Sequence, residues 1–361
     1  MLHALLFLAR RLHRSLRSGA PATHRLRGPR IPLNTRGGHQ APDAASGPRP
    51  TTDQRRACME LRIRDVSKTY PNGVQALKDV TLTIPAGMYG LLGPNGAGKS
   101  TLMRILATLQ EPDSGSATLG EIDVLRDKDA VRRTLGYLPQ EFGVYPKVSA
   151  MELLDHFALL EGVGDRRDRR KVVEALLQQT NLWDVRKQKL GGYSGGMRQR
   201  FGVAVALLGN PKLLIVDEPT AGLDPAERVR FLNLLSELGE NSVVLLSTHI
   251  VEDVSELCTN MAIIDQGEIL LEAEPLRAID DLRGRIWRRV ISKDALPKLE
   301  RQHAVISTKL LAGRTVARIH SDSSPGPEFE AAEPDLEDVY FSTMVGRIGR
   351  RSERPEPAVR S

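Results

Sequence analysis

Gly93-Pro-Asn-Gly-Ala-Gly-Lys-Ser-Thr101 is a complete phosphate-loop pattern, G-x-x-x-x-G-K-[ST], within a chain of 361 residues. The apolar residues 88–92 before it are typical of a buried strand, and residues 102–107 after it are typical of a helix. Closely spaced glycines let backbone N–H groups turn toward phosphate oxygens, and a helix N-terminus favours the same anion. The pattern therefore predicts a bound nucleoside triphosphate.

The side chains of this loop predict two kinds of contact. Lys99 is expected to reach the β and γ phosphates, and the Ser100 hydroxyl is expected to ligate Mg²⁺. The loop residues predicted to bind the nucleotide are Gly93, Pro94, Asn95, Gly96, Ala97, Gly98, Lys99, Ser100 and Thr101.

Two acids follow a second apolar strand pattern at residues 212–217. Parallel strands of an α/β sheet place ligands at their carboxyl ends. Asp217 is expected to hold Mg²⁺ through water, and Glu218 is expected to orient or deprotonate the attacking water. An isolated pair of acids is more often a solvated strand end, but the phosphate loop upstream favours the catalytic interpretation.

A glycine pair before a helix appears in Tyr193-Ser-Gly-Gly-Met197. Such a pair can be a simple turn and cap. Because it lies between a phosphate loop and an acid-ended strand, it resembles the signature of the ABC ATPases, and five or six motifs follow the family order across residues 61–278. The family signature usually begins with Leu and ends with Gln, where this chain has Tyr193 and Met197. Ser194, Gly195 and Gly196 keep the groups that the family uses for phosphate contact.

The resemblance implies roles for four further residues. Tyr70 would stack on the adenine, with an ordinary strand tyrosine as the alternative. Gln140 would contact Mg²⁺ and the attacking water and face a transmembrane partner. Asp224, which ends the Ala-Gly-Leu-Asp loop, would take part in communication between two subunits, and His249 would contact the γ-phosphate.

The expected fold is α/β, a P-loop NTPase core of ABC ATPase type with an inserted helical subdomain and a small C-terminal α/β accessory unit. We expect the ATPase domain at 59–284, with the helical subdomain at about 141–200. The accessory domain is expected at 285–345, followed by a disordered tail at 346–361. Whether the accessory unit regulates the ATPase or only covers a sheet edge stays open, and we favour regulation.

Periodicity and turn residues predict the individual elements. In the ATPase domain they are two strands around a turn at 71–73, a strand at 131–138, helices at 151–160 and 169–182, and strands at 212–217 and 242–247. In the accessory unit they are a strand at 285–292, a helix at 293–302, a hairpin from 305 to 320, a linker at 321–333 and a helix capped by Asp335.

The charge of the chain is concentrated at its N-terminus. Residues 1–58 contain eleven Arg and two Asp and carry +9, whereas the remainder carries −3. This basic segment is expected to be disordered, and it is either a targeting or lipid-surface segment or the product of an over-extended translation start. The near-neutral remainder gives no support for a nucleic-acid partner.

Two further compositional features limit the possible compartments. Cys58 and Cys258 lack the paired spacing of a metal site and are expected to be unpaired thiols in a reducing compartment. No apolar run approaches the ~20 residues of a membrane-spanning helix. A role at a membrane would therefore come through a partner.

The expected function is that of the ATP-binding and hydrolysing subunit of an ABC transporter. One set of motifs implies a homodimer or heterodimer of such subunits, beside a separate transmembrane permease at the cytoplasmic face of the cell membrane. The Tyr-Ser-Gly-Gly-Met form of the signature resembles that of a subgroup that drives drug and antibiotic exporters and related efflux or polysaccharide systems. The alternatives are a soluble ABC ATPase in translation, nucleic-acid or iron–sulfur processes, and a regulatory module with little hydrolysis, which Glu218 and His249 disfavour.

Overall fold

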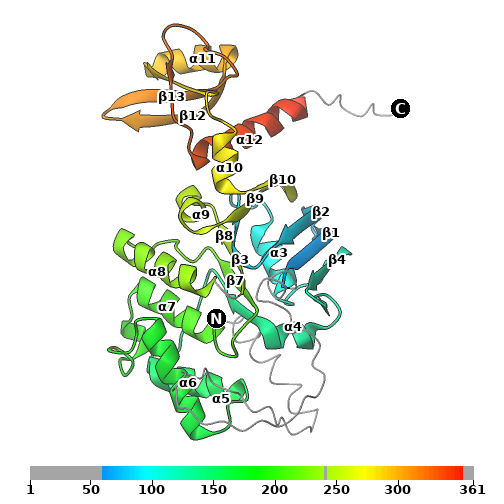
Figure 1. The fold of residues 1–361 in the computed structure, drawn as a ribbon, viewed down its shortest axis with the longest axis vertical. Helices are drawn as coiled ribbons and strands as arrows, with labels where there is room; N and C mark the ends of the chain where they lie inside the picture. Colours follow the sequence, from blue (N-terminus) through cyan, green and yellow to red (C-terminus); the bar gives the residue numbers. More distant parts are fainter. Residues whose placement is uncertain (1–58, 240–241, 353–361) are drawn as a thin grey trace, which may run out of the picture.

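The computed structural model describes residues 59–239 and 242–352. The expectations for residues 1–58 and 353–361 lie outside these ranges. Within them, three sheets and their helices form an elongated molecule with the nucleotide-binding core in the middle (Figure 1).

The central sheet has the strand order β10-β9-β3-β8-β7-β6. Its parallel strands are buried on both faces, as their continuous apolar sequences predict. They are β3 (Gly87–Leu92), β6 (Leu135–Leu138), β7 (Leu213–Asp217), β8 (Val243–Thr248) and β9 (Asn260–Asp265), and β10 (Glu268–Ala273) adds an antiparallel edge.

A second, antiparallel sheet packs beside this core. It confirms the predicted pair of strands around the turn at 71–73, with the order β2-β1-β4-β5. Its apolar side chains share one buried cluster with the phosphate-loop helix and the central sheet. The elements are β1 (Leu61–Thr69), β2 (Gln75–Ile84), β4 (Ser114–Leu119), β5 (Ile122–Asp123) and α3 (Lys99–Leu106).

The predicted strand at 131–138 is wrong in its first half. Helix α4 (Lys128–Thr134) occupies that part, and only β6 is a strand. The Asp127 side chain accepts a hydrogen bond from the Ala130 backbone N–H and caps the helix, and Val131 is its buried residue. A single buried apolar residue per turn suits a short helix as well as a strand, so periodicity could not separate them.

The helical subdomain is confirmed as an insertion, and it forms one end of the molecule (Figure 1). Ser149 and Glu152 form a reciprocal cap at the start of its first helix. A separate apolar cluster holds the helices together. They are α5 (Ala150–Leu160), α6 (Arg166–Gln179), the short η1 (Leu190–Gly192) and α7 (Gly195–Ala206), and α7 also packs on the central core.

Three helices complete the ATPase core: α8 (Pro225–Leu238), α9 (Val251–Leu257) and α10 (Pro275–Asp280). Cys258 follows α9 as a free, buried thiol, and burial raises its pKa to about 12. Cys58 lies outside the described ranges. In those ranges no helix has the length and apolar character needed to cross a bilayer.

The accessory unit forms the opposite end of the molecule (Figure 1). The predicted strand, helix and hairpin are confirmed, but the predicted linker contains a short strand, β14, which pairs with β11. The elements are β11 (Ile286–Ile291), η2 (Lys293–Ala295), α11 (Leu296–Gln302), β12 (Ala304–Leu311), β13 (Arg314–His320) and β14 (Glu330–Ala331).

The last helix, α12 (Leu336–Ser352), begins after Asp335, whose side chain accepts a hydrogen bond from the Asp338 backbone N–H as predicted. It extends to residue 352 and so overlaps the first seven residues of the predicted disordered tail. Leu336 and Val339 belong to the same apolar cluster as Val254 of α9. The final helix therefore packs on the ATPase core.

Candidate nucleotide-binding and catalytic site

The phosphate loop connects β3 to α3 and borders a cavity of about 740 Å³. Gly98 has φ +108°, and a Cβ there would lie 2.5 Å from the Ala76 carbonyl oxygen, so only glycine fits. Among the predicted site residues, those that line the cavity are Tyr70, Pro94, Asn95, Gly96, Gly98, Lys99, Ser100, Thr101, Gln140 and Glu218.

Lys99 is almost completely buried, with 4% of its surface exposed. Its Nζ donates hydrogen bonds to the carbonyl oxygens of Gly93 and Pro94, at 2.7 and 3.1 Å. The same atom lies 3.2 Å from Glu218 Oε1. The ammonium group is thus held between the loop and the carboxylate that follows β7.

The Asp217 carboxylate at the end of β7 faces the phosphate-loop serine. The Ser100 hydroxyl lies 3.5 Å from Asp217 Oδ1, and the Ser247 hydroxyl donates a hydrogen bond to that same oxygen. Oxygen atoms of this kind suit Mg²⁺, which is usually held by one or two carboxylates together with phosphate oxygens. In the ranges with assigned structure, no group of three or more His, Cys, Asp or Glu side chains could hold a metal by itself. The Ser100 and Asp217 oxygens match the ligand type that Mg²⁺ prefers.

Glu218 has a left-handed backbone conformation, with φ +47°. A residue other than glycine adopts it at a cost of about 1–3 kcal/mol, and such residues are concentrated at functional sites. Its backbone N–H donates to the Ser247 carbonyl oxygen at 3.0 Å. Its Oε2 lies 3.0 Å from His249 Nδ1 and accepts a hydrogen bond from the Gln140 amide at 3.4 Å. The Glu218 carboxylate thus contacts three predicted residues from distant segments, Lys99, Gln140 and His249.

Tyr70 lies at the loop side of the cavity. Its hydroxyl is 3.1 Å from Thr101 Oγ1 and donates to Gln110 Oε1 at 3.2 Å. Burial acts to raise the pKa of Tyr70, but these hydrogen bonds and the charge of Arg104 outweigh it and lower the pKa below its ordinary value. The hydroxyl contacts fix the position of the ring beside the phosphate loop.

The signature residues lie away from this cavity. Ser194 caps α7 by accepting a hydrogen bond from the Met197 backbone N–H at 3.1 Å, and Gly195 and Gly196 form the first turn. Asp224 likewise caps α8 by accepting from the Glu227 backbone N–H at 2.9 Å. The fold brings together the phosphate loop, Asp217, Glu218, Gln140 and His249, and it does not bring Ser194, Gly195, Gly196 or Asp224 to the same cavity.

Sequence reasoning missed a second group of polar residues behind the site. Asp253 of α9 is fully buried and accepts hydrogen bonds from the hydroxyls of Thr220 and Thr248, at 2.5 and 3.1 Å. Its other oxygen, Oδ1, accepts from Arg228 Nε at 2.8 Å. The sequence Ser247-Thr248 at the end of a buried strand could have indicated this group, because buried hydroxyls need hydrogen-bond partners.

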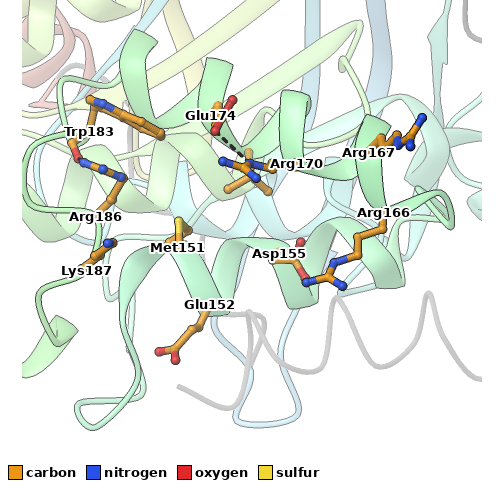
Figure 2. Close-up of a pocket in the computed structure, with 11 residues that line it drawn as sticks. Met151, Glu152, Asp155, Arg166, Arg167, Arg170, Glu174, Trp183, Arg186 and Lys187 are labelled. Carbon is orange, nitrogen blue, oxygen red and sulfur yellow. Dashed lines mark hydrogen bonds and ion pairs between the residues drawn. The ribbon is translucent and has the colours of Figure 1, made fainter.

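A second cavity, of about 640 Å³, lies on the helical subdomain (Figure 2). We call it the subdomain groove. It contains no predicted site residue, and only one ion pair, Arg170 with Glu174 at 3.1 Å, joins two of its described lining residues. The Arg186 guanidinium stacks on the Trp183 ring at 3.8 Å. Its charged and polarisable lining consists of Met151, Glu152, Asp155, Arg166, Arg167, Arg170, Glu174, Trp183, Arg186 and Lys187.

Known proteins are similar to this chain. A family model described as ABC transporter matches residues 77–221. An uncharacterized ABC transporter ATP-binding protein of Bacillus subtilis, YxlF, is 33% identical over 309 residues, which cover 79% of this chain and 99% of the relative. The chain belongs to the ABC transporter ATP-binding proteins.

Two other ABC transporter ATP-binding proteins have names that refer to drugs. The "Probable multidrug ABC transporter ATP-binding protein YbhF" of Escherichia coli is 33% identical over 79% of this chain, which spans about half (52%) of that relative. The daunorubicin/doxorubicin resistance ATP-binding protein DrrA of Streptomyces peucetius is 36% identical over 72% of this chain and 76% of its own length.

A solved ABC cassette has the same core fold. It is a dimeric ATP-binding cassette in a post-hydrolysis state bound to ADP and Pi. It is 28% identical, has a TM-score of 0.54, and covers 59% of this chain and 98% of its own. The core of this chain is therefore an ABC ATPase cassette of mixed α/β fold.

Proposed function

We propose that this chain binds and hydrolyses ATP and couples the cycle to a separate transmembrane permease, as part of an exporter of drug-like compounds. The observation that carries the proposal is the Glu218 carboxylate, which lies 3.2 Å from Lys99 Nζ and 3.0 Å from His249 Nδ1 at the end of a buried strand. An acid in this position can act on a water that attacks a bound γ-phosphate.

ATP binding would begin with an exchange of partners at Lys99. The ammonium group now contacts two loop carbonyls and Glu218, and the β and γ phosphates would replace some of these contacts. Ser100, Asp217 through water, and Gln140 would hold Mg²⁺, which supplies positive charge that offsets the charge of the phosphates. Tyr70 would place its ring on the adenine.

The chemical step depends on Glu218 and its two neighbours. Once Lys99 turns to the phosphates, Glu218 is free to orient the water and to accept its proton. Gln140 and His249 hold the carboxylate from two sides, and His249 would also contact the γ-phosphate. Gln140 and His249 therefore position the carboxylate that accepts the proton.

The separation of the signature from the cavity supports a dimer. Ser194 and Gly195 are exposed at the N-terminus of α7, and neither they nor the buried Gly196 line the nucleotide cavity of their own subunit. In a dimer this end would close on the nucleotide held by the other subunit, and Asp224 would lie at the contact between the two. A homodimer and a heterodimer both satisfy this geometry.

The subdomain groove is the proposed contact with the permease, at the cytoplasmic face of the membrane. Arg166, Arg167 and Lys187 are exposed and have no ion-pair partner among the described residues. Five cations and three acids line the groove, so it carries an excess of positive charge. A permease segment that carries acidic side chains, together with an apolar side chain to contact Trp183, would complement this groove.

The names of the relatives favour an exporter over a soluble ATPase. They include multidrug, daunorubicin/doxorubicin and linearmycin resistance proteins. The proposed substrate class is accordingly a drug-like or antibiotic compound, which the permease selects.

The deciding experiment uses Glu218→Gln protein, loaded with ATP and purified by affinity from detergent-solubilised membranes. A stoichiometric multi-span membrane protein in the eluate, identified by mass spectrometry, is the expected result. Lys99→Ala protein, which should bind the triphosphate poorly, is the matched control for ATP-dependent capture. Recovery with ribosomal or assembly-factor proteins alone would refute the transporter assignment.

A further inference from the structure

We infer that the first turn of α8 links the two half-sites within one subunit: it ties the signature helix, which faces the partner's nucleotide, to the residues around Glu218 and His249. Glu227 and Arg228 are the two linking residues, and Arg200 and Asp253 are their partners. This inference rests on the proposed function, because it concerns how one ATP site responds to the other.

The first half of the link joins α8 to the signature helix α7. Arg200 of α7 and Glu227 of α8 form a mostly buried ion pair, with 8% and 15% of the two side chains exposed. Gly196 packs so closely against the Glu227 carboxylate that a Cβ there would collide with it. A shift of the signature turn must therefore move Glu227.

The second half joins α8 to the catalytic side. Arg228 Nε donates to Asp253 at 2.8 Å, and Asp253 also accepts from Thr220 and Thr248. Thr220 lies two residues after Glu218, and Thr248 directly precedes His249. The Thr248 hydroxyl in turn accepts from the Ile250 backbone N–H at 2.9 Å, so it fixes the backbone on both sides of His249.

The turn between the two halves is stiff. Asp224 caps it, Pro225 occupies its first position, and Glu227 and Arg228 are consecutive residues of one helix. Consecutive helical side chains point in different directions, so one residue can reach α7 while the next reaches α9. The turn can therefore carry a displacement from one side to the other.

Each arginine of the link also has an unused donor. Arg200 Nε and Arg228 Nη2 are buried without a hydrogen-bond partner among the residues that the structure describes. A buried donor without an acceptor is energetically unfavourable. Each arginine can therefore gain a hydrogen bond if the link moves to a second arrangement.

The link makes Asp253 and Glu227 positioning residues, since neither borders the nucleotide cavity. ATP engaged by the signature of one subunit would move Glu227 and Arg228 and, through Asp253, set His249 and the segment after Glu218. Hydrolysis at one site would then depend on nucleotide at the other.

The test measures ATP hydrolysis by the full chain against ATP concentration for Asp253→Asn and Glu227→Gln. We expect kcat to fall about tenfold and the Hill coefficient to fall toward 1, while the affinity for ATP, measured separately, changes less than twofold. Asp253→Glu should recover part of the cooperativity. Thermal unfolding of each variant identifies any loss of folded protein.

Matched controls lie beside each residue. Glu252→Gln removes an exposed acid next to Asp253, and Arg230→Gln removes the exposed second partner of Glu227, 2.9 Å away, while leaving Arg200 in place. Both should keep the wild-type kcat and Hill coefficient. Should Asp253→Asn fail to fold, Thr220→Val removes one hydrogen bond to Asp253 at nearly constant volume and should lower the Hill coefficient in the same direction.

The outcomes separate the link from the proposed function. Wild-type protein that hydrolyses ATP cooperatively, with folded variants that keep both kcat and Hill coefficient, would overturn the link alone. A parallel fall in ATP affinity and in kcat would also overturn it, because it would indicate general damage to the pocket. Wild-type protein without any ATPase activity would instead overturn the proposed function.

Discussion

The nucleotide cavity and the subdomain groove are similar in volume, about 740 and 640 Å³, and both are lined by charged side chains. They differ in how these charges are held. Lys99, Asp217 and Glu218 are 3–6% exposed. Lys99 contacts Glu218 and the loop backbone, and Asp217 contacts the hydroxyls of Ser100 and Ser247. Arg166 and Arg167 of the groove are exposed on a helix surface.

This difference separates a site for chemistry from a site for recognition. Buried charges at strand ends are placed before the substrate arrives, and only Lys99 is expected to exchange partners on binding. Such preorganisation is what transition-state stabilisation requires. Exposed arginines lose side-chain entropy when they are ordered, but they adapt to a partner and steer it electrostatically. Changes in the cavity should therefore alter rate constants, and changes in the groove should alter association.

The largest expected effect comes from Glu218→Gln. Loss of the proton acceptor should lower kcat by roughly 10²–10⁴-fold while ATP still binds. Steady-state hydrolysis and nucleotide binding, measured in parallel, check this result. Glu237→Gln, which changes an exposed acid on α8, is the control. If Glu218→Gln protein turned over at more than a tenth of the normal rate, the cavity would not be the site of chemistry.

A charge reversal in the groove, Arg167→Glu, tests whether the groove is the site of recognition. It should reduce capture of the permease at least tenfold, because an acidic segment would then meet an acid. The ATP affinity of the isolated subunit should not change. Pull-down from membranes over a salt series measures the effect, which should shrink as salt screens the charges. Equal capture at every salt concentration would place the permease elsewhere.

A smaller effect is expected at Tyr70, at the edge of the cavity. Tyr70→Ala removes the ring and should weaken ATP binding about tenfold, in keeping with ~1–3 kcal/mol for aromatic stacking on a base. Tyr70→Phe keeps the ring and loses only the contacts to Thr101 and Gln110. Titration with ATP distinguishes the two variants. Equal weakening by both would assign the role to the hydroxyl instead of the ring.

The smallest expected effect is on stability, at Arg170→Gln. This change breaks the exposed pair with Glu174 on α6 and should lower the free energy of unfolding by about 0.3–0.5 kcal/mol. Urea denaturation at low salt measures it, with Lys171→Gln as a neighbouring exposed control that breaks the pair with Asp168. A loss above ~2 kcal/mol would mean that the charges of the groove contribute to folding stability and not only to recognition.

The site could be predicted wherever one short stretch of sequence determines a geometry. The phosphate loop, the acids after β7 and the histidine after β8 each follow a buried strand, and parallel strands deliver their ends to one edge. The left-handed backbone of Glu218 and the contacts of Thr220 and Arg228 with Asp253 could not be predicted, because they depend on residues that lie 25 or more positions apart in the sequence.

The errors in the fold have a similar origin. Residues 128–134 contain one buried apolar residue, so their pattern does not distinguish a helix from a strand. The Asp127 cap and the packing of Val131 favour the helix. Strand β14 consists of two exposed residues, which are extended because they pair with β11. Helix α12 continues past 346 although its sequence there is polar and basic.

Helix α12 has a consequence for how the accessory unit can be studied. Its residues Leu336 and Val339 are buried in the apolar cluster that also contains Val251 and Val254 of α9, the helix that bears Asp253. A chain cut near residue 285 would therefore lose a wall of the ATPase core together with the accessory sheet. A deletion that joins α10 directly to α12 would keep that wall in place, so it would reveal what the sheet itself contributes.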